Sequence, residues 1–448
     1  MTTLLQRFLN VRRDEAAPLL VAALYFFCVL TALMVLRPAR DALGMRSGLD
    51  AIRWLFIGTA VVTLAVNPMF GWLVSRFRRL TFITATYVFF GLSLAGFYGL
   101  IVAAPEAIGE ISGRVFYVWY SVFNLFSTMV FWALMADRFS LEQSKRLFGA
   151  IAVGGTLGAI AGPALASMLA APLGTPALLL VSVAFLALAV AAAWGVAWLQ
   201  PEQSRDTTAG DASIATANVN RAVIGGSAWE GLRAAFRSPY LLGISTYILL
   251  LTVIATFIYF TRLQMVATLG DNTDVRTTAL AQIDLITQVS TLLLQLVVTG
   301  HLMKRFGVSV ALALLPIVVS IGFIGLAMVA SFAALIVFDA TFRAIQRAIT
   351  RPARETLFTV VTREDKYKSK AFTDTFVYRG GDVLGAWTEG LLGRLGMALV
   401  GLASVAVPLA LAWAMLGLWL GRRQESVVAS KAATEDLEHG ASLTSPAT

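Results

Sequence analysis

The chain of 448 residues is 58% hydrophobic and only 14% charged, with a mean hydropathy of +0.76. A soluble protein of this length normally carries about a quarter charged residues, so the composition excludes an ordinary soluble globular protein. The net charge of +9 would suit nucleic-acid binding. In a membrane protein, however, Lys and Arg concentrate in cytoplasmic loops for topological reasons, and we therefore expect no nucleic-acid partner.

Residues typical of catalytic and metal sites are scarce. The two histidines, His301 and His439, lie far apart in sequence, and Cys28 is the only cysteine. A single cysteine cannot form an intrachain disulfide. The two histidines are too far apart in sequence to match the spacing of a metal-binding motif. Nucleophile-elbow and P-loop motifs are absent from the sequence as well. We expect no catalytic residues, no metal and no cofactor, and a protein that is not an enzyme.

Apolar runs long enough to cross a hydrocarbon core of about 30 Å follow one another along the chain. The first run follows a basic N-terminus, as a signal peptide would, but it is too long for the apolar core of one and lacks a small-residue cleavage site. We predict an all-α polytopic membrane protein with twelve transmembrane helices. The predicted spans are residues 17–37, 53–75, 80–103, 114–136, 147–171, 175–199, 241–261, 278–302, 307–329, 332–350, 371–393 and 397–420.

A polar stretch rich in Ser, Thr, Asp and Ala separates span six from span seven and predicts an irregular linker at 200–226. It ends in SAWEGLRAAFR, which places Trp229, Leu232 and Phe236 on one helical face, a pattern typical of a helix in the membrane interface. The predicted organisation has four parts. They are a six-helix half (1–199), a cytoplasmic linker with the interfacial helix (200–237), a second six-helix half (238–421) and a disordered cytoplasmic tail (422–448).

Basic residues predict the orientation. If both termini are cytoplasmic, most of the lysines and arginines fall in cytoplasmic segments and few fall in external loops. We therefore expect both termini in the cytoplasm.

Span ten carries Asp339, Arg343, Arg347 and Arg351 at intervals of four residues. On an α-helix this spacing places them on one slowly drifting face. Ionisable groups at bilayer depth are costly unless they are paired or face water, so they are functional candidates. The face is either a structural ladder, in which Asp339 neutralises Arg343, or the wall of a water-filled cavity that holds an anion.

Span eight places Asp284, Gln288, Thr291 and Gln295 on one face. These residues either make polar contacts between packed helices or line a cavity. Asp284 is also a candidate partner for an arginine of span ten.

Span eleven contains Asp374, Arg379, Asp382 and Glu389. Internal pairing of aspartate with arginine is the structural alternative to a role in binding. The adjacent Gly380-Gly381 pair would let a neighbouring backbone approach closely or let the helix bend.

The motif Arg-Pro-Ala-Arg followed by an acid occurs twice, as RPARD at 37–41 and RPARE at 351–355. Pro38 and Pro352 each remove a backbone hydrogen bond. Each motif therefore predicts a helix break at a wet place, with arginines on either side of the break. The alternative is a simple helix end with a self-paired arginine and acid.

Internal similarity supports two related halves. GWLVSRFRR (71–79) and GHLMKRFGV (300–308) share Gly, Leu and Arg-Phe at the same spacing, and GGTLG (154–158) weakly echoes GGDVLG (380–385). A six-plus-six repeat with a basic loop between the second and third helices resembles the major facilitator superfamily, although Ser75 replaces the family's loop aspartate. The resemblance implies a central cavity lined by helices one, four, seven and ten.

A narrower resemblance rests on LRPARD, on FWALMADRFSLEQSKRLFG and on RPARETLFTVVTREDKYKSKAFTDTFVYRGGD. These segments look like the ATP/ADP-translocase-type nucleotide exchangers, so a divergent bacterial antiporter is implied. Arg37, Arg40 and Asp41 match that family's Arg-x-x-Lys-Asp, with Arg40 in place of the lysine. Three other positions depart from that family's pattern. This chain has Tyr120 and Tyr259 where the family has acids in helices four and seven, and it has Asp382 where the family has a lysine in helix eleven.

We predict a monomeric secondary active transporter of the bacterial inner membrane that works by alternating access. Its expected substrate is an organic anion, such as a nucleotide or another phosphorylated solute. Its expected partners are an anionic small molecule and membrane lipids, because planar arginines suit phosphate and carboxylate. The alternatives are a proton-coupled carrier of another small solute, in which Asp284 or Asp382 titrates, and a non-transporting, lipid-interacting membrane protein. The candidate substrate-binding residues are Arg37, Arg40, Asp41, Asp284, Gln288, Asp339, Arg343, Arg347, Arg379 and Asp382.

Overall fold

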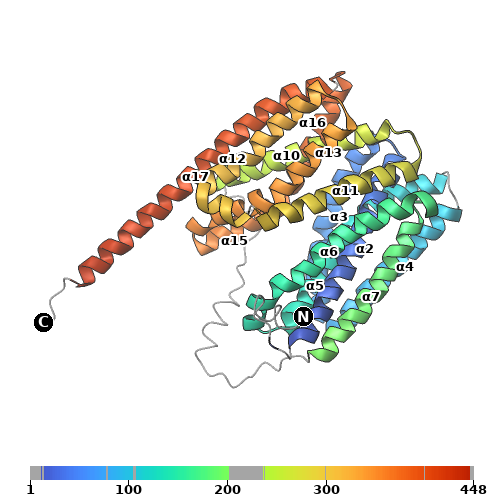
Figure 1. The fold of residues 1–448 in the computed structure, drawn as a ribbon, viewed down its shortest axis with the longest axis horizontal. Helices are drawn as coiled ribbons and strands as arrows, with labels where there is room; N and C mark the ends of the chain where they lie inside the picture. Colours follow the sequence, from blue (N-terminus) through green and yellow to red (C-terminus); the bar gives the residue numbers. More distant parts are fainter. Residues whose placement is uncertain are drawn as a thin grey trace. The chain divides into compact units, whose positions relative to one another are not determined.

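The structure, a computed structural model, describes residues 12, 15–76, 79–103, 107–200, 236, 238–297, 299–397 and 399–443. Every regular element in these ranges is a helix (Figure 1). The all-α class is therefore confirmed. Most of the predicted linker, with its interfacial helix, lies outside the described residues.

Ten helices in the described part of the chain are long and apolar enough to cross a membrane. They follow the predicted spans in order. These helices are α2 (Ala16–Met45), α3 (Leu49–Arg76), α4 (Arg79–Ala103), α5 (Ala107–Arg138), α6 (Leu141–Leu173), α7 (Ala177–Leu199), α10 (Pro239–Ala267), α11 (Thr273–Val297), α12 (Thr299–Met328) and α17 (Leu399–Leu443).

The two remaining predicted spans are helical but interrupted by π-helical turns. The first consists of α13 (Phe332–Ile345), the π-helix η2 (Gln346–Thr350), α14 (Arg351–Thr356) and the 3₁₀ turn η3 (Leu357–Val360). The second follows α15 (Arg363–Phe372) and consists of the π-helix η4 (Thr373–Val377) and α16 (Tyr378–Arg394). All twelve predicted spans thus correspond to helical segments.

The two prolines do not break their helices as expected. Pro38 lies inside α2, which runs without interruption from Ala16 to Met45, so the predicted break at the first RPAR motif is wrong. Neighbouring helices can compensate for the one hydrogen bond that a proline removes. Pro352 follows the π-helical turn, in which the Arg351 N–H donates to the Gln346 carbonyl, and it lies in the first turn of α14. This wider turn changes the helical register but does not end the helix.

The π-helical turn also corrects the expectation for span ten. Asp339 and Arg343 lie on α13 and keep the spacing of an α-helical face. Arg347 lies in η2 and Arg351 begins α14. Because a π-helix closes i→i+5 hydrogen bonds, a spacing of four residues no longer defines one face beyond Gln346.

Contacts divide the chain into two units. The first comprises residues 1–214 and 262–289, and the second comprises residues 215–261 and 290–448. The C-terminal end of α10 and most of α11 therefore group with helices that precede the linker. The predicted division at 200–237 did not anticipate this grouping.

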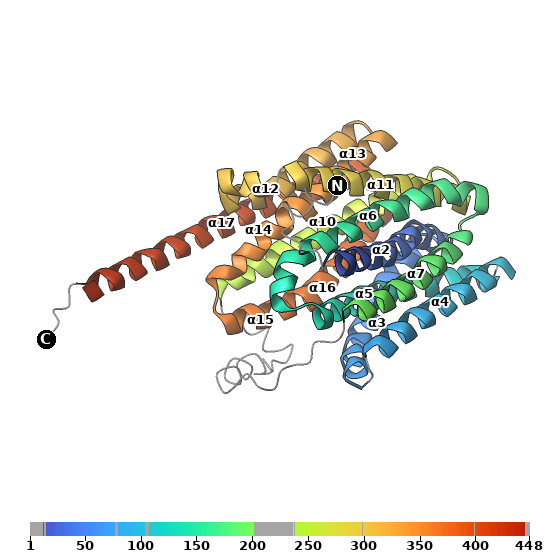
Figure 2. The ribbon, with the colours of Figure 1, turned by 60° about the horizontal axis from the view of Figure 1, so that its bottom comes forward.

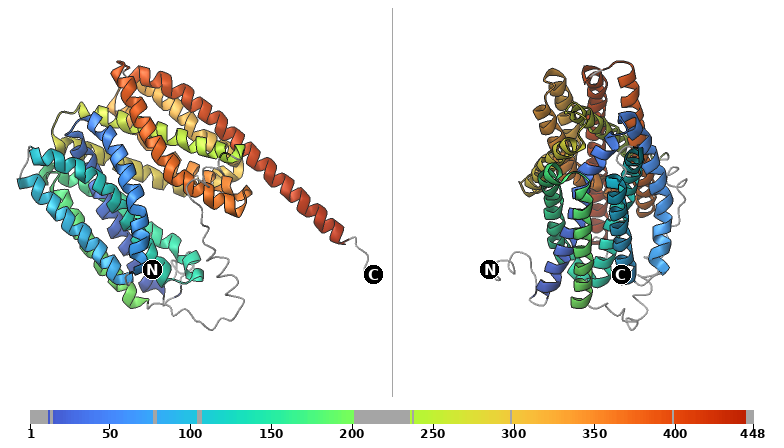
Figure 3. Two further views of the ribbon diagram at one scale, coloured as in Figure 1. Left: turned by 180° about the vertical axis from the view of Figure 1, so that it is seen from behind. Right: turned by 90° about the vertical axis from the view of Figure 1, so that its right-hand side faces the viewer.

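In the first unit, α6 packs along α2 through small residues (Figures 1 and 3). A Cβ at Gly154 would clash with the Ala23 carbonyl, and one at Gly158 would clash with the Phe27 carbonyl. Glycines four residues apart lie on one helical face, which lets the two backbones approach closely.

In the second unit, α16 contacts α10 in the same manner. A Cβ at Gly381 would clash with Thr252, and one at Gly385 would lie 2.8 Å from the Cβ of Thr256. The weak echo between 154–158 and 380–385 thus has a structural meaning. In each case glycines bring a later helix against the first helix of the same predicted half.

We expect Gly158→Ala to destabilise the fold by roughly 1–3 kcal/mol, because the added methyl group overlaps the backbone of α2. Gly149→Ala in the same helix is the matched control, since a Cβ there meets nothing within 4 Å. Alanine favours an exposed helix position over glycine, so the control should be neutral or stabilising. Thermal unfolding of the detergent-solubilised protein measures the difference, and equal losses in the two variants would contradict the packing argument.

The predicted disordered tail differs from the structure. Helix α17 continues beyond Arg422 as far as Leu443 (Figure 2). Residues 422–443 include four alanines and three glutamates, which favour helix over irregular structure. Gln424 also fixes this helix to the end of α14, because its Nε2 donates to the Thr356 carbonyl at 2.9 Å.

Glu15, just before α2, joins the starts of α2 and α6. Its carboxylate accepts hydrogen bonds from Arg146 at 2.8 Å, from Gln143 at 3.2 Å and from the Arg12 backbone N–H at 3.0 Å. Burial by itself would raise the pKa of Glu15, but Arg146 and the other donors hold this pKa below its ordinary value of 4.5. The ionised form is therefore the one that the fold stabilises.

We expect Glu15→Gln to lower the melting temperature near neutral pH. The folded pKa lies below the unfolded one, so the carboxylate stabilises the fold above pH 4.5 and loses this effect as the pH falls through the folded pKa. The difference between variant and wild type should therefore shrink in that acidic range. Thermal melts across a pH series test this, and a difference that stayed constant with pH would show that Glu15 acts through packing alone.

Candidate functional site

Three arginines and two aspartates form a buried ion-pair cluster in the first unit. Arg37, Arg40 and Asp41 lie on α2, Arg262 lies on α10 and Asp284 lies on α11. We call these five side chains the charged cluster.

Arg262 is the centre of the charged cluster. Its Nη1 donates to Oδ1 of Asp284 at 3.0 Å, and its Nη2 donates to Oδ2 of Asp41 at 3.1 Å. All three side chains are buried, and that of Arg262 is 0% exposed. The planar guanidinium suits this arrangement, because its two terminal nitrogens can serve two carboxylates at once. Arg262 thereby ties α10 to both α2 and α11.

Arg37 and Arg40 flank this centre and are more accessible. Nε of Arg37 lies 3.6 Å from Oδ2 of Asp284, and Nη2 of Arg40 lies 2.5 Å from Oδ1 of Asp41. Their side chains are 18% and 15% exposed. Since the 3.6 Å contact of Arg37 is longer than an ordinary hydrogen bond, it holds its carboxylate less firmly than Arg262 does.

Two tyrosines of α5 pack against Arg40. Its guanidinium carbon lies 4.6 Å from the ring centroid of Tyr117 and 5.0 Å from that of Tyr120, within the range of cation–π contacts. The Tyr120 hydroxyl donates to the Leu33 carbonyl of α2 at 3.0 Å. Tyr120 thus supports the guanidinium of Arg40 and is itself anchored to the backbone of α2.

The members of the charged cluster carry three positive charges and two negative charges. The formal charge of these five side chains is therefore +1. A buried charge is stable only when it is compensated, and partly exposed arginines bind carboxylate or phosphate through paired hydrogen bonds. The arrangement is suited to one anionic group beside Arg37 and Arg40.

Gln288 lies one helical turn beyond Asp284 on α11 and also faces α2, where its Nε2 is 4.0 Å from Sδ of Met34. The structure therefore brings together five of the predicted site residues: Arg37, Arg40, Asp41, Asp284 and Gln288.

The other predicted site residues belong to the second unit. Nε of Arg343 donates to Oδ1 of Asp339 at 2.8 Å, and Asp339 is fully buried. Arg379 lies 3.5 Å from Asp382 on α16. Both are local pairs, as the structural alternatives for spans ten and eleven anticipated. Arg347, in η2, is half-buried.

The second RPAR motif forms a polar cluster of its own. Arg354 is buried, donates to the Tyr378 hydroxyl and lies 3.5 Å from Glu355, which also pairs with Lys370 of α15. In both copies of the motif the second arginine therefore pairs with the acid that follows it. In the first copy the acid, Asp41, also pairs with Arg262, which is distant in sequence.

Sequence reasoning missed Arg262. The predicted span ended at residue 261 and left Arg262 in a loop, whereas α10 continues to Ala267. The signal was available, because the apolar pattern resumes after Arg262 with Leu263, Met265 and Val266. An arginine one position outside a predicted span end should be counted with the span.

Comparison with known proteins establishes the class. A family model described as Major Facilitator Superfamily matches residues 19–345. The chain therefore belongs to the major facilitator superfamily, and it is a multi-pass membrane protein with a transporter fold. A search of curated protein sequences gave no match.

Several solved structures share this fold. A mutant form of the nucleoside transporter NupG has 12% identity and a TM-score of 0.55, with 92% of this chain and 98% of that chain covered. A bacterial homologue of the iron transporter ferroportin, in an inward-facing state, has 13% identity and a TM-score of 0.63, with 91% and 98% covered. A POT family transporter in complex with a thioalcohol-conjugated peptide has 11% identity and a TM-score of 0.60, with 89% and 96% covered. At these identities the likeness concerns the fold alone.

Proposed function

We propose that this protein is a secondary active transporter that moves an organic anion across the bacterial inner membrane by alternating access. The observation that carries the proposal is the charged cluster. It places a formal charge of +1 and two partly exposed arginines among buried helices of a major facilitator fold. Ionisable groups at bilayer depth are costly, so arginines that are kept there are candidates for substrate binding.

The members of the charged cluster have different roles in this proposal. Arg37 and Arg40 bind the anion, because they are the most exposed of the five and carry the planar donor sets that match phosphate or carboxylate. Arg262 is a positioning residue, since it is fully buried between Asp41 and Asp284. Gln288 is a neutral donor on the same face of α11 as Asp284.

Phosphorylated solutes, including nucleotides, are the substrate class that the residues favour. Two buried tyrosine rings pack against Arg40 and fix the orientation of its planar guanidinium, whose donors match a phosphate group. The resemblance of the first RPAR motif to that of nucleotide exchangers supports exchange of one such solute for another.

A proton-coupled carrier of another solute is the second candidate. The favouring observation is Asp382, which lies inside α16 and has only a 3.5 Å contact with Arg379. Because this contact is long and therefore weak, little interaction with Arg379 is lost when the carboxylate of Asp382 binds a proton.

Transport assays in proteoliposomes separate these possibilities. We expect labelled ADP or another phosphorylated solute to enter liposomes loaded with unlabelled solute of the same kind, with no need for a pH gradient. Uptake that required a pH gradient would favour the second candidate. No flux of any anion, with the protein correctly folded, would leave the non-transporting, lipid-interacting alternative.

We also expect residues 200–226 to be cytoplasmic, because the distribution of basic residues favours two cytoplasmic termini. A single cysteine placed in this segment, in a Cys28→Ser background, should resist a membrane-impermeant thiol reagent in intact cells. It should react after the cells are opened. Labelling in intact cells would reverse the proposed orientation.

A further inference from the structure

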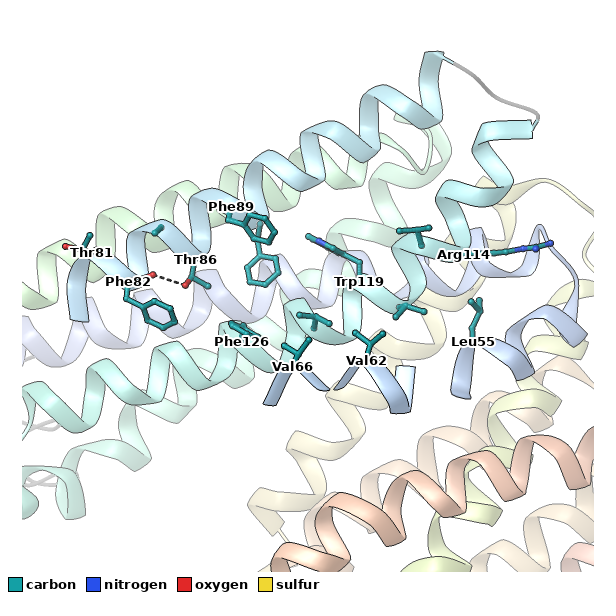
Figure 4. A pocket seen from close by; sticks show the side chains of 15 residues that line it. Leu55, Val62, Val66, Thr81, Phe82, Thr86, Phe89, Arg114, Trp119 and Phe126 are labelled. Atoms are coloured by element: carbon teal, nitrogen blue, oxygen red, sulfur yellow. Dashed lines mark hydrogen bonds between the residues drawn. The ribbon is translucent and has the colours of Figure 1, made fainter. Parts of the chain in front are cut away.

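Helices α3, α4 and α5 leave an open groove of about 880 Å³ between them, within the first unit (Figure 4). Its size falls in the range of ligand-binding pockets. Thr81 lies at one end and Arg114 at the other, with the rings of Phe82, Phe89, Phe126 and Trp119 between them. Apart from its ends, the groove is lined almost wholly by aliphatic and aromatic side chains.

The groove runs along the membrane-crossing direction of its helices. Arg114 and Phe126 are 12 residues apart on α5, which corresponds to about 18 Å of helix at 1.5 Å per residue. One leaflet of a bilayer with a hydrocarbon core of about 30 Å is about 15 Å thick. The groove therefore matches a single acyl chain that enters from the leaflet next to Arg114.

A pair of opposite charges stands at the mouth of the groove. Nη2 of Arg114 donates to Oε1 of Glu110 at 2.6 Å, and its Nε donates to the Ser47 hydroxyl at 2.8 Å. The side chains of Arg114 and Glu110 are 46% and 45% exposed, so both can receive a further partner. A phospholipid headgroup with a phosphate and a primary ammonium complements both charges.

We propose that this groove is a binding site for one phosphatidylethanolamine molecule. An acyl chain lies along Trp119, Val122 and Phe126, the phosphate pairs with Arg114, and the ammonium donates to Glu110. Phosphatidylcholine lacks the N–H donors for Glu110, and phosphatidylglycerol lacks the positive charge. The site is separate from the charged cluster, and it holds whether or not the transport proposal does.

Native mass spectrometry of the purified full-length protein tests the headgroup. We expect phosphatidylethanolamine to be retained about tenfold more strongly than phosphatidylcholine or phosphatidylglycerol with the same acyl chains, as the loss of one hydrogen bond to a charged group would produce. The variant Glu110→Gln should lose this preference. Equal retention of the three lipids by the wild-type protein would overturn the proposal.

Two further variants test the groove itself. Ala85→Phe, on α4, should fill the groove and reduce retention of phosphatidylethanolamine. Val88→Phe is the matched control, because Val88 is an exposed residue of α4 that does not line the groove. An unchanged occupancy in Ala85→Phe would show that the lipid binds elsewhere.

Tryptophan fluorescence gives a second readout that does not depend on the fold of the Ala85 variant. Phosphatidylethanolamine with brominated acyl chains should quench the wild-type protein more than Trp119→Phe, since Trp119 lines the groove. Equal fractional quenching of the two proteins would contradict the placement of the acyl chain.

Discussion

Replacing Arg262 with methionine should destabilise the protein by about 3–5 kcal/mol and abolish transport, because it leaves two buried carboxylates without the cation that they share. Asp41 and Asp284 are 1% and 3% exposed, so water cannot replace the lost guanidinium without a rearrangement of α2, α10 and α11. Thermal unfolding in detergent and proteoliposome uptake measure the two effects.

The matched control for this prediction is Arg276→Met. Arg276 is also a buried arginine, on α11, but its partner Asp271 is fully exposed and can be solvated when the arginine is lost. We expect a much smaller loss of stability there. Removing one acid as well, in Arg262→Met with Asp284→Asn, should recover part of the stability lost in the single variant. A single variant as stable as wild type would show that Arg262 does not hold the charged cluster together.

The second prediction separates binding from folding. Arg37→Gln should leave the melting temperature close to that of wild type, because Arg37 makes a long 3.6 Å contact with Asp284 and is partly exposed. Transport should nevertheless fall by a factor of about 10 to 100, as expected when a charged hydrogen bond to the substrate is lost. Initial uptake rates at equal protein content test this.

Arg46→Gln is the control for Arg37→Gln, since Arg46 is an exposed arginine just after α2. We expect normal transport in this variant. If Arg37→Gln lowered the melting temperature as much as Arg262→Met, Arg37 would be a structural residue. If it transported at the wild-type rate, the anion would not bind at Arg37.

The sequence was most informative where the structure depends on local periodicity. Apolar length alone located the helices. The spacing of four residues between Asp339 and Arg343 allowed an ion pair as one of two alternatives, and this pair is present at 2.8 Å. The glycine echo was visible as a weak repeat, and the close contacts of α6 with α2 and of α16 with α10 explain it.

The pairing of Asp41 with Arg262 could not be predicted from the sequence, for a physical reason. The two residues are 221 positions apart, and no periodic pattern reports on a contact at that separation. The predicted end of span seven also hid Arg262, because an arginine usually marks the end of an apolar run. Likewise the proline rule applies to an isolated helix, whereas Pro38 lies in a helix with buried residues on both sides of it.

The π-helical turns have a consequence for motion. A π turn contains one more residue than an α turn of the same helix. The turns η2, before α14, and η4, after α15, therefore each shift the helical register by one residue. If η2 converted to α-helix, the chain after it would rotate by about 100° and advance by about 1.5 Å, the step of one residue. Such a conversion would turn Arg354 away from Tyr378 while every residue remained helical. A screw motion of this kind re-aims charged side chains without exposing backbone hydrogen-bonding groups to lipid.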